Sequence, residues 1–171
     1  MCSHPLRVSN FEDWRTSVRL YLMQHGEAMR EEQDPARPLT EKGWADTRRV
    51  IRHAVERAGV HVTRICHSGK LRARQTAEMW REHLSFPIPI TEVDGLDPMA
   101  SPEIWSQRLG EETGDVLLVG HLPHLARLAA LLVCGTGDKE PITFRNGGLV
   151  CLQRAEPGGW SVRWILTPDV L

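Results

Sequence analysis

Short runs that are apolar or rich in β-branched residues, and that stop at a polar residue and a glycine, recur along the chain and predict strands. The runs span residues 20–24, 62–66 and 115–119, and they are followed by His25-Gly26, His67-Ser68-Gly69 and Gly120-His121. Four aliphatic residues in succession make the third run the clearest strand. A continuous apolar strand is typical of a parallel sheet that is covered on both faces.

Segments with helical spacing of apolar residues separate these runs. The expected helices span residues 41–58, 71–84, 101–109 and 122–133. Thr40 and Ser101 are expected to be the N-cap residues of the first and third helices. Residues 86–90 contain two prolines and are predicted to form an edge strand, with an acidic loop over residues 91–98.

The alternation of strands and helices predicts an α/β fold, a three-layer sandwich with a mainly parallel central sheet flanked by helices. Residues 147–152 and 160–166 are expected to add a C-terminal hairpin, joined through residues 156–159. Residues 18–171 are expected to form one domain. Residues 1–17 show neither period and predict a loosely ordered extension or a misassigned start.

The composition of the chain argues against several classes of function. The 171 residues carry a net charge of −1, which argues against a broad surface for nucleic acid or anionic lipid. The four cysteines form neither a Cys-x-x-Cys motif nor a zinc-spaced cluster, and they indicate reduced thiols. Neither a signal peptide nor a membrane-spanning run is recognisable, so the sequence predicts a soluble, cytoplasmic protein.

The carboxyl ends of parallel strands meet at one edge of a sheet, which brings His25, Ser68, Arg72 and His121 together. Two imidazoles, a guanidinium and a hydroxyl form a site for an anion, and phosphate fits it best. A neutral His25 would attack phosphorus in line, while Arg72 and His121 would stabilise the equatorial oxygens. Water would then hydrolyse the phosphohistidine, and the scheme requires neither a metal nor a cofactor.

Four segments in order resemble the histidine phosphatase superfamily, and within it the small SixA-type phosphohistidine phosphatases. They are Leu-Met-Gln-His-Gly-Glu at 22–27, Arg-Pro-Leu-Thr-Glu-Lys-Gly at 37–43, Ser-Gly-Lys-Leu-Arg-Ala-Arg-Gln-Thr at 68–76 and Gly-His-Leu-Pro-His at 120–124. The resemblance implies that His25 is the nucleophile and that Arg72 and His121 line the phosphate pocket. It also implies an open site and a substrate in signal transduction, such as the phosphohistidine of a histidine phosphotransfer domain.

This chain departs from the usual Arg-His-Gly motif of the family, because Gln24 occupies the arginine position. A neutral amide donates a hydrogen bond of roughly half the strength of a charged one. The departure predicts weakened activity or phosphate binding alone. Gly69 likewise occupies a usual proline position and is expected to loosen the loop.

No glutamate is recognisable as a general acid. Asp94 and Asp97 are the candidates, although an Asp-Gly-Leu-Asp-Pro segment equally suits turn formation and capping. An imidazole leaves phosphorus more readily than an alkoxide does, which favours phosphohistidine over sugar phosphates as the substrate.

Other residues near these motifs have a functional and a structural interpretation. Gly26 would let the backbone approach a phosphate closely. Ser68 would contact phosphate or cap the following helix. Glu27 would position water or tune His25, or be an exposed loop acid, and Arg37 would hold an acidic phosphoprotein at the rim or simply be solvated.

The sequence therefore predicts a cofactor-independent protein phosphohistidine phosphatase that acts through phospho-His25. Two alternatives stay open, a small-molecule phosphomonoesterase and a non-catalytic phosphate- or phosphoprotein-binding module. A metal hydrolase is a remote third.

Overall fold

The structure is a computed structural model that describes residues 17–154 and 158–171. The expected N-terminal extension lies outside this range except for Ser17, as do the first two residues of the expected hairpin connection. In the described part, the strands are β1 (Arg19–Gln24), β2 (Arg64–His67), β3 (Ile90–Glu92), β4 (Val116–Gly120), β5 (Leu149–Arg154) and β6 (Trp160–Leu166). The helices are α1 (Glu41–Glu56), α2 (Leu71–Met79), α3 (Pro102–Gly110) and α4 (His124–Cys134), with short 3₁₀ turns at Trp80–Glu82 (η2) and Pro168–Val170 (η3).

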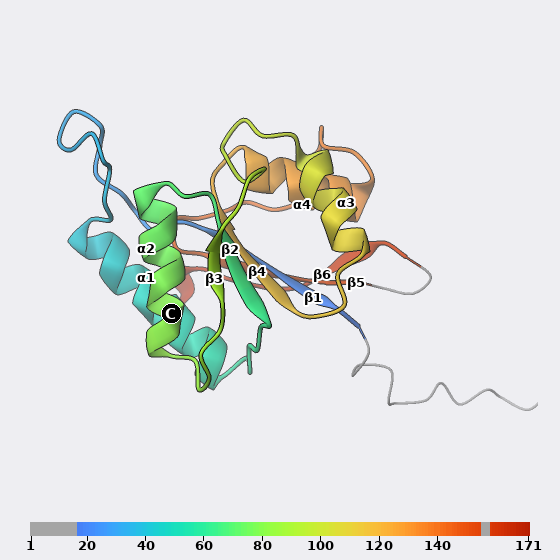
Figure 1. Cartoon of the computed structure of the whole chain (residues 1–171), viewed down its shortest axis with the longest axis horizontal. Coiled ribbons are helices and arrows are strands. Elements are labelled where there is room, and N and C mark those ends of the chain that lie inside the picture. Colours follow the sequence, from blue (N-terminus) through green and yellow to red (C-terminus); the bar gives the residue numbers. More distant parts are fainter. Residues whose placement is uncertain (1–16, 155–157) are drawn as a thin grey trace, which may run out of the picture.

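The six described strands form one sheet in the order β3-β2-β4-β1-β5-β6. Neighbours from β3 to β1 are parallel, whereas β5 pairs antiparallel with β1 and with β6. The helices α1 and α2 lie on one side of the sheet, and α3 and α4 lie on the other (Figure 1). The predicted three-layer α/β architecture with a C-terminal hairpin is therefore confirmed.

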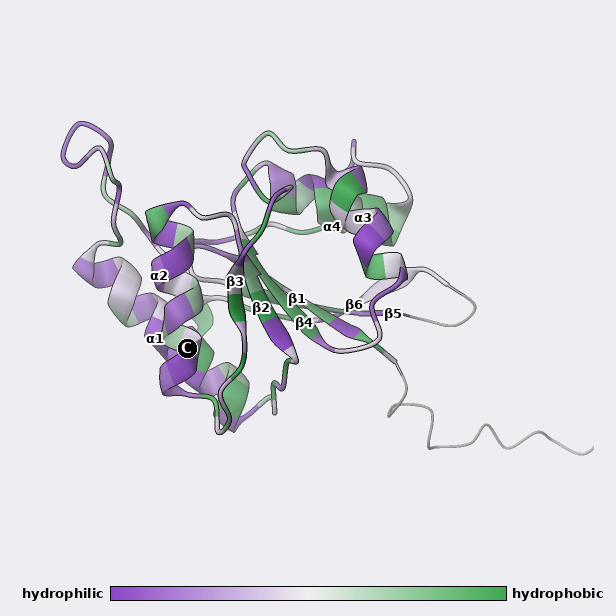
Figure 2. Ribbon diagram, viewed as in Figure 1, coloured by the Kyte–Doolittle hydropathy of each residue, from purple (hydrophilic) through white to green (hydrophobic). Residues whose placement is uncertain are grey.

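Both faces of the central strands are buried, which explains their continuous apolar sequences. In β1, Tyr21 and Met23 pack in the cluster on the α1 and α2 side, whereas Leu20 and Leu22 pack in the cluster on the α3 and α4 side. Alternate residues of β4 divide between the same two clusters. Figure 2 shows the apolar strands between helices with polar outer faces. Two cores thus fix the central strands from both sides.

The helix α1 follows the prediction closely. Thr40 has an extended backbone, and its side chain accepts a hydrogen bond from the Gly43 amide, as an N-cap should. The second expected helix is shorter than predicted, because α2 ends at Met79 and the 3₁₀ turn η2 follows. The buried Trp80 at this junction donates its indole N–H to the Met23 sulfur at 3.4 Å.

The predicted boundaries of the edge strand were wrong. The strand β3 does lie at the edge of the sheet, but it begins at Ile90 and includes Thr91 and Glu92, which were assigned to the acidic loop. Parallel pairing with β2 places Ile90, Thr91 and Glu92 opposite Ile65, Cys66 and His67. The strand forms where it meets β2, beyond the prolines that weaken backbone pairing.

Ser101 is the N-cap residue of α3, as predicted, but its hydroxyl does not bond to the backbone of the first turn of the helix. The hydroxyl instead donates to the Glu103 carboxylate. None of the described helices is long and apolar enough to cross a membrane.

Candidate active site

The sheet brings the predicted residues to one edge. Strands β2, β4 and β1 are adjacent and parallel, with Gln24 opposite Gly120 and His67 opposite Val119. His25, Ser68 and His121 therefore follow neighbouring strand ends, and Arg72 lies in the first turn of α2. Each comes from a different loop or helix, but the strand register sets their relative positions.

Two hydrogen bonds define the state of His25. Its Nδ1 lies 2.7 Å from the carbonyl oxygen of Gly26, which can only accept, so Nδ1 carries the proton. The guanidinium Nε of Arg72 donates to His25 Nε2 at 3.2 Å. His25 is therefore a neutral imidazole whose Nε2 lone pair faces Arg72, which is the form that a nucleophile requires.

His121 lies beside His25, with ring centroids 4.9 Å apart and planes inclined by 56°. Its Nε2 is 2.5 Å from the Ser68 hydroxyl. The N-cap position of α2 is held by Lys70 and not by Ser68. Ser68 thus contacts His121 and does not occupy the N-cap of α2, and its contact with phosphate stays a prediction.

Burial keeps both imidazoles neutral near pH 7. The pKa of His25 is lowered to about 4, mainly by removal from water; the hydrogen bond to Gly26 opposes this lowering, and the positive charges of Arg72 and Arg37 add to it. Burial lowers the pKa of His121 to about 3, assisted by the charges of His25 and Arg72. An anion in this pocket would therefore meet a cationic guanidinium and two uncharged rings.

The amide of Gln24 is turned toward the loop before β5. Its Nε2 donates to Asn146 Oδ1 at 3.0 Å, and the buried Oε1 has no hydrogen-bond partner among the described residues. The Gly147 amide donates to the carbonyls of Gln24 and His25 at 3.0 and 3.1 Å. Gln24 is thus bound to the 145–147 loop through its side chain and its carbonyl, and one of its two amide protons is already engaged.

The helix α2 also fixes the backbone around His25. The Gly26 amide donates to Thr76 Oγ1 at 3.0 Å, and the same hydroxyl donates to the Arg72 carbonyl at 2.8 Å. A Cβ on Gly26 would lie 2.5 Å from Thr47 Oγ1, so only glycine fits there. Thr76 thereby links the nucleophile's loop to the helix that carries Arg72.

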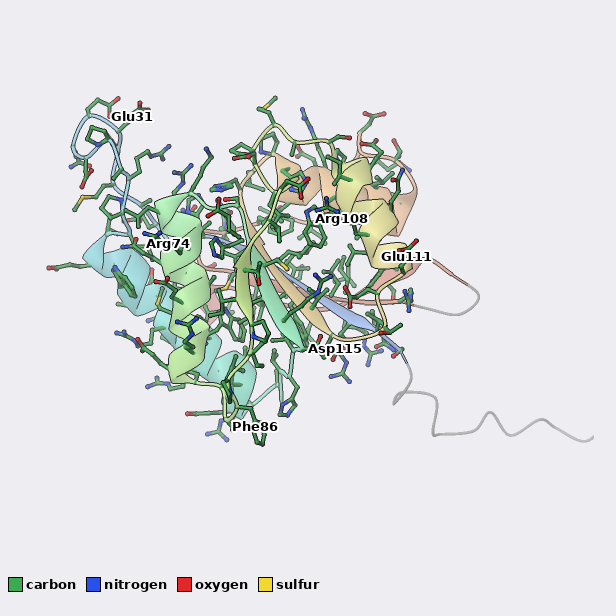
Figure 3. The ribbon with its side chains drawn as sticks, viewed as in Figure 1. Glu31, Arg74, Phe86, Arg108, Glu111 and Asp115 are labelled. Atoms are coloured by element: carbon green, nitrogen blue, oxygen red, sulfur yellow. The ribbon has the colours of Figure 1, made fainter. Side chains whose placement is uncertain are left out.

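Glu27 and Arg37 lie at the rim. Glu27 is exposed, and its carboxylate accepts a hydrogen bond from the Thr40 hydroxyl at 3.0 Å. Arg37 is partly buried, and its Nε donates to the Met29 carbonyl. Its charge lowers the pKa of both His25 and Arg72, which places it within electrostatic reach of the pocket. The loop between these two residues projects from the molecule at the end opposite Phe86, with Glu31 at its tip (Figure 3).

The two candidate acids have different partners. Asp94 is bound by Arg108 of α3 through both carboxylate oxygens, at 2.8 and 3.0 Å, so it anchors its loop. Asp97 lies 3.4 Å from the ammonium group of Lys70, the residue before α2. Asp94 thus joins its loop to α3, whereas Asp97 pairs with the residue that precedes α2, the helix that carries Arg72.

Gly69 has a backbone φ of +81°, and its amide donates to His67 Nδ1 at 3.1 Å. Proline can neither take this backbone conformation nor donate this hydrogen bond, because its φ is fixed near −65° and it has no N–H. The glycine in the family's usual proline position therefore gives this loop a conformation of its own.

Sequence reasoning missed Asn146 and the role of Thr76. Thr76 lies in the 68–76 segment of the resemblance, but nothing in its spacing indicates that its hydroxyl joins the Gly26 amide to the Arg72 carbonyl. Asn146 lies in a loop without periodicity, 122 residues after Gln24, and no local pattern could have indicated their contact.

We compared the chain with known protein families, curated proteins and solved structures. The family model of the histidine phosphatase superfamily (branch 1) matches residues 20–111, which is more than half of the chain. The chain belongs to the histidine phosphatase superfamily. Its members are phosphatases, and the predicted resemblance is confirmed.

Two relatives are similar over most of their length. The phosphohistidine phosphatase SixA of Escherichia coli K12 is 28% identical over 156 residues, which cover 88% of this chain and 94% of SixA. An uncharacterized protein of Picosynechococcus sp. is 32% identical over 143 residues, covering 80% of this chain and 85% of the relative.

Solved structures share the fold. The protein histidine phosphatase SixA in complex with tungstate has a TM-score of 0.78 and 26% identity, covering 90% of this chain and 99% of SixA. The α-ribazole phosphatase of Shigella flexneri has a TM-score of 0.72 at 16% identity, with 88% and 97% covered, and shows the fold alone.

Proposed function

We propose that this protein is a phosphohistidine phosphatase that hydrolyses protein phosphohistidine through a covalent phospho-His25 intermediate. The single observation that carries the proposal is the neutral His25, whose Nδ1 is fixed on the Gly26 carbonyl while Nε2 faces Arg72. Similarity to SixA supports the choice of substrate. Tungstate, which SixA binds, is a tetrahedral oxyanion like phosphate.

In the first step, His25 Nε2 attacks phosphorus, and the P–N bond to the substrate imidazole breaks. The Arg72 guanidinium, which donates to Nε2 in the free site, turns its N–H groups to the phosphoryl oxygens. The departing imidazole takes a proton from solvent or from an acid at the rim. In the second step, water attacks phosphorus, the P–Nε2 bond breaks, and inorganic phosphate leaves.

His121 contributes a polar ring beside the reacting phosphorus. Its Nε2 is bound to the Ser68 hydroxyl and is the ring atom that would donate to a phosphoryl oxygen, because Nδ1 is buried, without a hydrogen-bond partner among the described residues. Preorganised donors of this kind commonly contribute about a hundredfold or more to a rate. The substrate would be a signalling protein that carries phosphohistidine, such as a histidine phosphotransfer domain.

The test is to trap the intermediate. The protein is incubated with ³²P-labelled phosphohistidine protein, quenched in alkali, and digested to locate acid-labile, alkali-stable phosphate. We expect label on His25 in the wild type and neither label nor release above background in His25→Ala. Equal slow release by both proteins would overturn the enzymatic function. Turnover that is unchanged after exhaustive chelation would exclude a metal hydrolase.

A non-catalytic phosphoprotein-binding module is the second candidate, and the contact between Gln24 and Asn146 favours it. Because Asn146 engages a Gln24 amide proton and no charge stands at this position, the pocket has less power to stabilise a transition state. Tight phosphate binding without turnover would identify this alternative. Efficient cleavage of p-nitrophenyl phosphate but not of phosphohistidine would instead identify a phosphomonoesterase.

A further inference from the structure

A hollow of about 530 Å³, lined mainly by charged and polar residues, lies beside the loop that follows β1 and the loop that precedes β5. Glu27, two residues after the nucleophile, lines it together with Asn146, which accepts the Gln24 hydrogen bond. Its other walls come from the start of α1 and from the 3₁₀ turn η3 near the C-terminus. The volume is in the range of ligand-binding pockets, and two of its wall residues are tied to the nucleophile's loop.

Most charges in the hollow neutralise one another. Asp46 forms ion pairs with both Lys42 and Arg49, and Arg49 also donates to the Pro168 carbonyl at 2.7 Å. These contacts join α1 to η3 and leave little freedom to bind a ligand. We therefore do not assign a ligand-binding role to Lys42, Asp46 and Arg49.

Arg145 is different. Its side chain lines the hollow and is exposed, and it has no ion pair or side-chain hydrogen bond to any residue that the structure describes. The hydrogen bond from the Thr167 side chain is the main cause that lowers the pKa of the nearby Asp169 carboxyl, and the positive charge of Arg145 adds to this lowering. The neighbouring Asn146 offers its Nδ2 protons, since its Oδ1 is occupied by Gln24. The guanidinium of Arg145 and the amide of Asn146 thus come from consecutive residues of one loop. The Gly147 amide of this loop donates to the carbonyls of Gln24 and His25.

We propose that this hollow is a substrate subsite that binds an acidic side chain flanking the phosphohistidine of the protein substrate. Arg145 would pair with the carboxylate and Asn146 would donate to the same segment, while the phosphoryl group enters the pocket of His25 and Arg72. The inference rests on the proposed function for its substrate. It assigns specificity to a loop that takes no part in the chemistry.

The test uses two peptides that carry a stable phosphonate analogue of phosphohistidine and differ only in having Glu or Gln beside it. Binding to the full-length protein is measured by fluorescence anisotropy. We expect the wild type to bind the Glu peptide about tenfold more tightly, because a guanidinium–carboxylate bond is charge-assisted. Arg145→Gln should remove this preference, and Arg145→Glu should shift it toward a Lys-flanked peptide.

Arg163→Gln is the matched control, since Arg163 is an exposed arginine of β6 outside the hollow, and it should keep the tenfold preference. Equal binding of the two peptides by the wild type, no binding of either, or a preference that survives Arg145→Gln would overturn the subsite. Phosphate release from true phosphohistidine peptides is measured in parallel. No release with the Glu preference intact would overturn the proposed function alone, and release at equal rates would overturn the subsite alone.

Discussion

The guanidinium of Arg72 donates through Nε to Nε2 of His25 at 3.2 Å, so the group proposed to bind phosphoryl oxygens also engages the lone pair of the proposed nucleophile. Arg72→Ala should lower kcat at least about a hundredfold, because it removes both a charged donor and a restraint on the imidazole. Arg72→Lys should retain part of the rate, since it keeps the charge but loses the planar fork. Single-turnover phosphate release measures both effects.

The control is Arg74→Ala on the same helix. Arg74 is exposed, lies on the outer side of α2 (Figure 3), and is 4.0 Å from Glu78. It should change the rate by less than about twofold, as is usual for a weak surface pair. An Arg72→Ala rate equal to that of Arg74→Ala would contradict the role given to Arg72.

The buried histidines make stability depend on pH. Burial lowers the pKa of His124 to about 4, and both of its ring nitrogens lack partners among the described residues. The unfolded chain takes up protons near pH 6.5, whereas the folded protein does so only near pH 4. Stability should therefore be full above about pH 6.5 and fall as pH drops toward 4, by up to about 1.4 kcal/mol per pH unit for one histidine.

Urea unfolding at pH 7 and at pH 5 tests this expectation, with His124→Asn as the comparison. The variant should lose less stability between the two values, because asparagine takes up no proton. NMR titration of the histidine Hε1 signals gives an independent check. A His124 midpoint near its ordinary value of 6.5 would contradict the assignment.

The contact between Gln24 and Asn146 predicts the effect of restoring a charge. Gln24→Arg should raise kcat about tenfold, because a charged donor replaces an amide that is turned to Asn146. Loss of the amide pair should reduce stability by about 1 kcal/mol. A double-mutant cycle with Asn146→Ala should show non-additive effects, since the two side chains are in contact. An unchanged or lower rate in Gln24→Arg would show that the position does not limit turnover.

The buried hydroxyl of Thr76 should affect both stability and rate, because it bonds the Gly26 amide and the Arg72 carbonyl. In Thr76→Val the shape is kept, but the Gly26 amide loses its acceptor and the Arg72 carbonyl loses a donor. We expect a loss of about 1–3 kcal/mol in unfolding free energy, with a slower rate because His25 loses its fixed backbone. Thr76→Ser keeps the hydroxyl and should recover most of the rate. Wild-type kinetics in Thr76→Val would rule out this positioning role.

The close approach of α1 to the nucleophile's loop depends on Gly43. A Cβ at this position would overlap the backbone carbonyl of Glu27, which cannot move aside as a flexible side chain could. Gly43→Ala should therefore destabilise the protein by about 2 kcal/mol or more. Gly110→Ala is the matched control, because nothing lies within 4 Å of the added Cβ and the change should stay within about 0.5 kcal/mol. Thermal unfolding of the two variants, compared side by side, measures the difference.

The sequence by itself determined the central strands, the capped start of α1 and the identity of the residues that follow the strand ends. These features depend on short-range patterns: four aliphatic residues in β4, a threonine three residues before a glycine, and a histidine after an apolar run. Each pattern lies within a few residues of sequence, because an N-cap bond spans one helical turn and a strand buried on both faces is a continuous apolar run.

Only the tertiary structure decided the partners of those residues. It set the tautomer of His25 through Gly26 and Arg72, turned Gln24 toward a loop 122 residues away, and bound Asp94 to α3. The strand β3 also begins later than predicted, because an edge strand forms where the neighbouring strand, here β2, supplies hydrogen-bond partners. Such contacts join distant segments, and their geometry is fixed by sheet register and packing that no local pattern encodes.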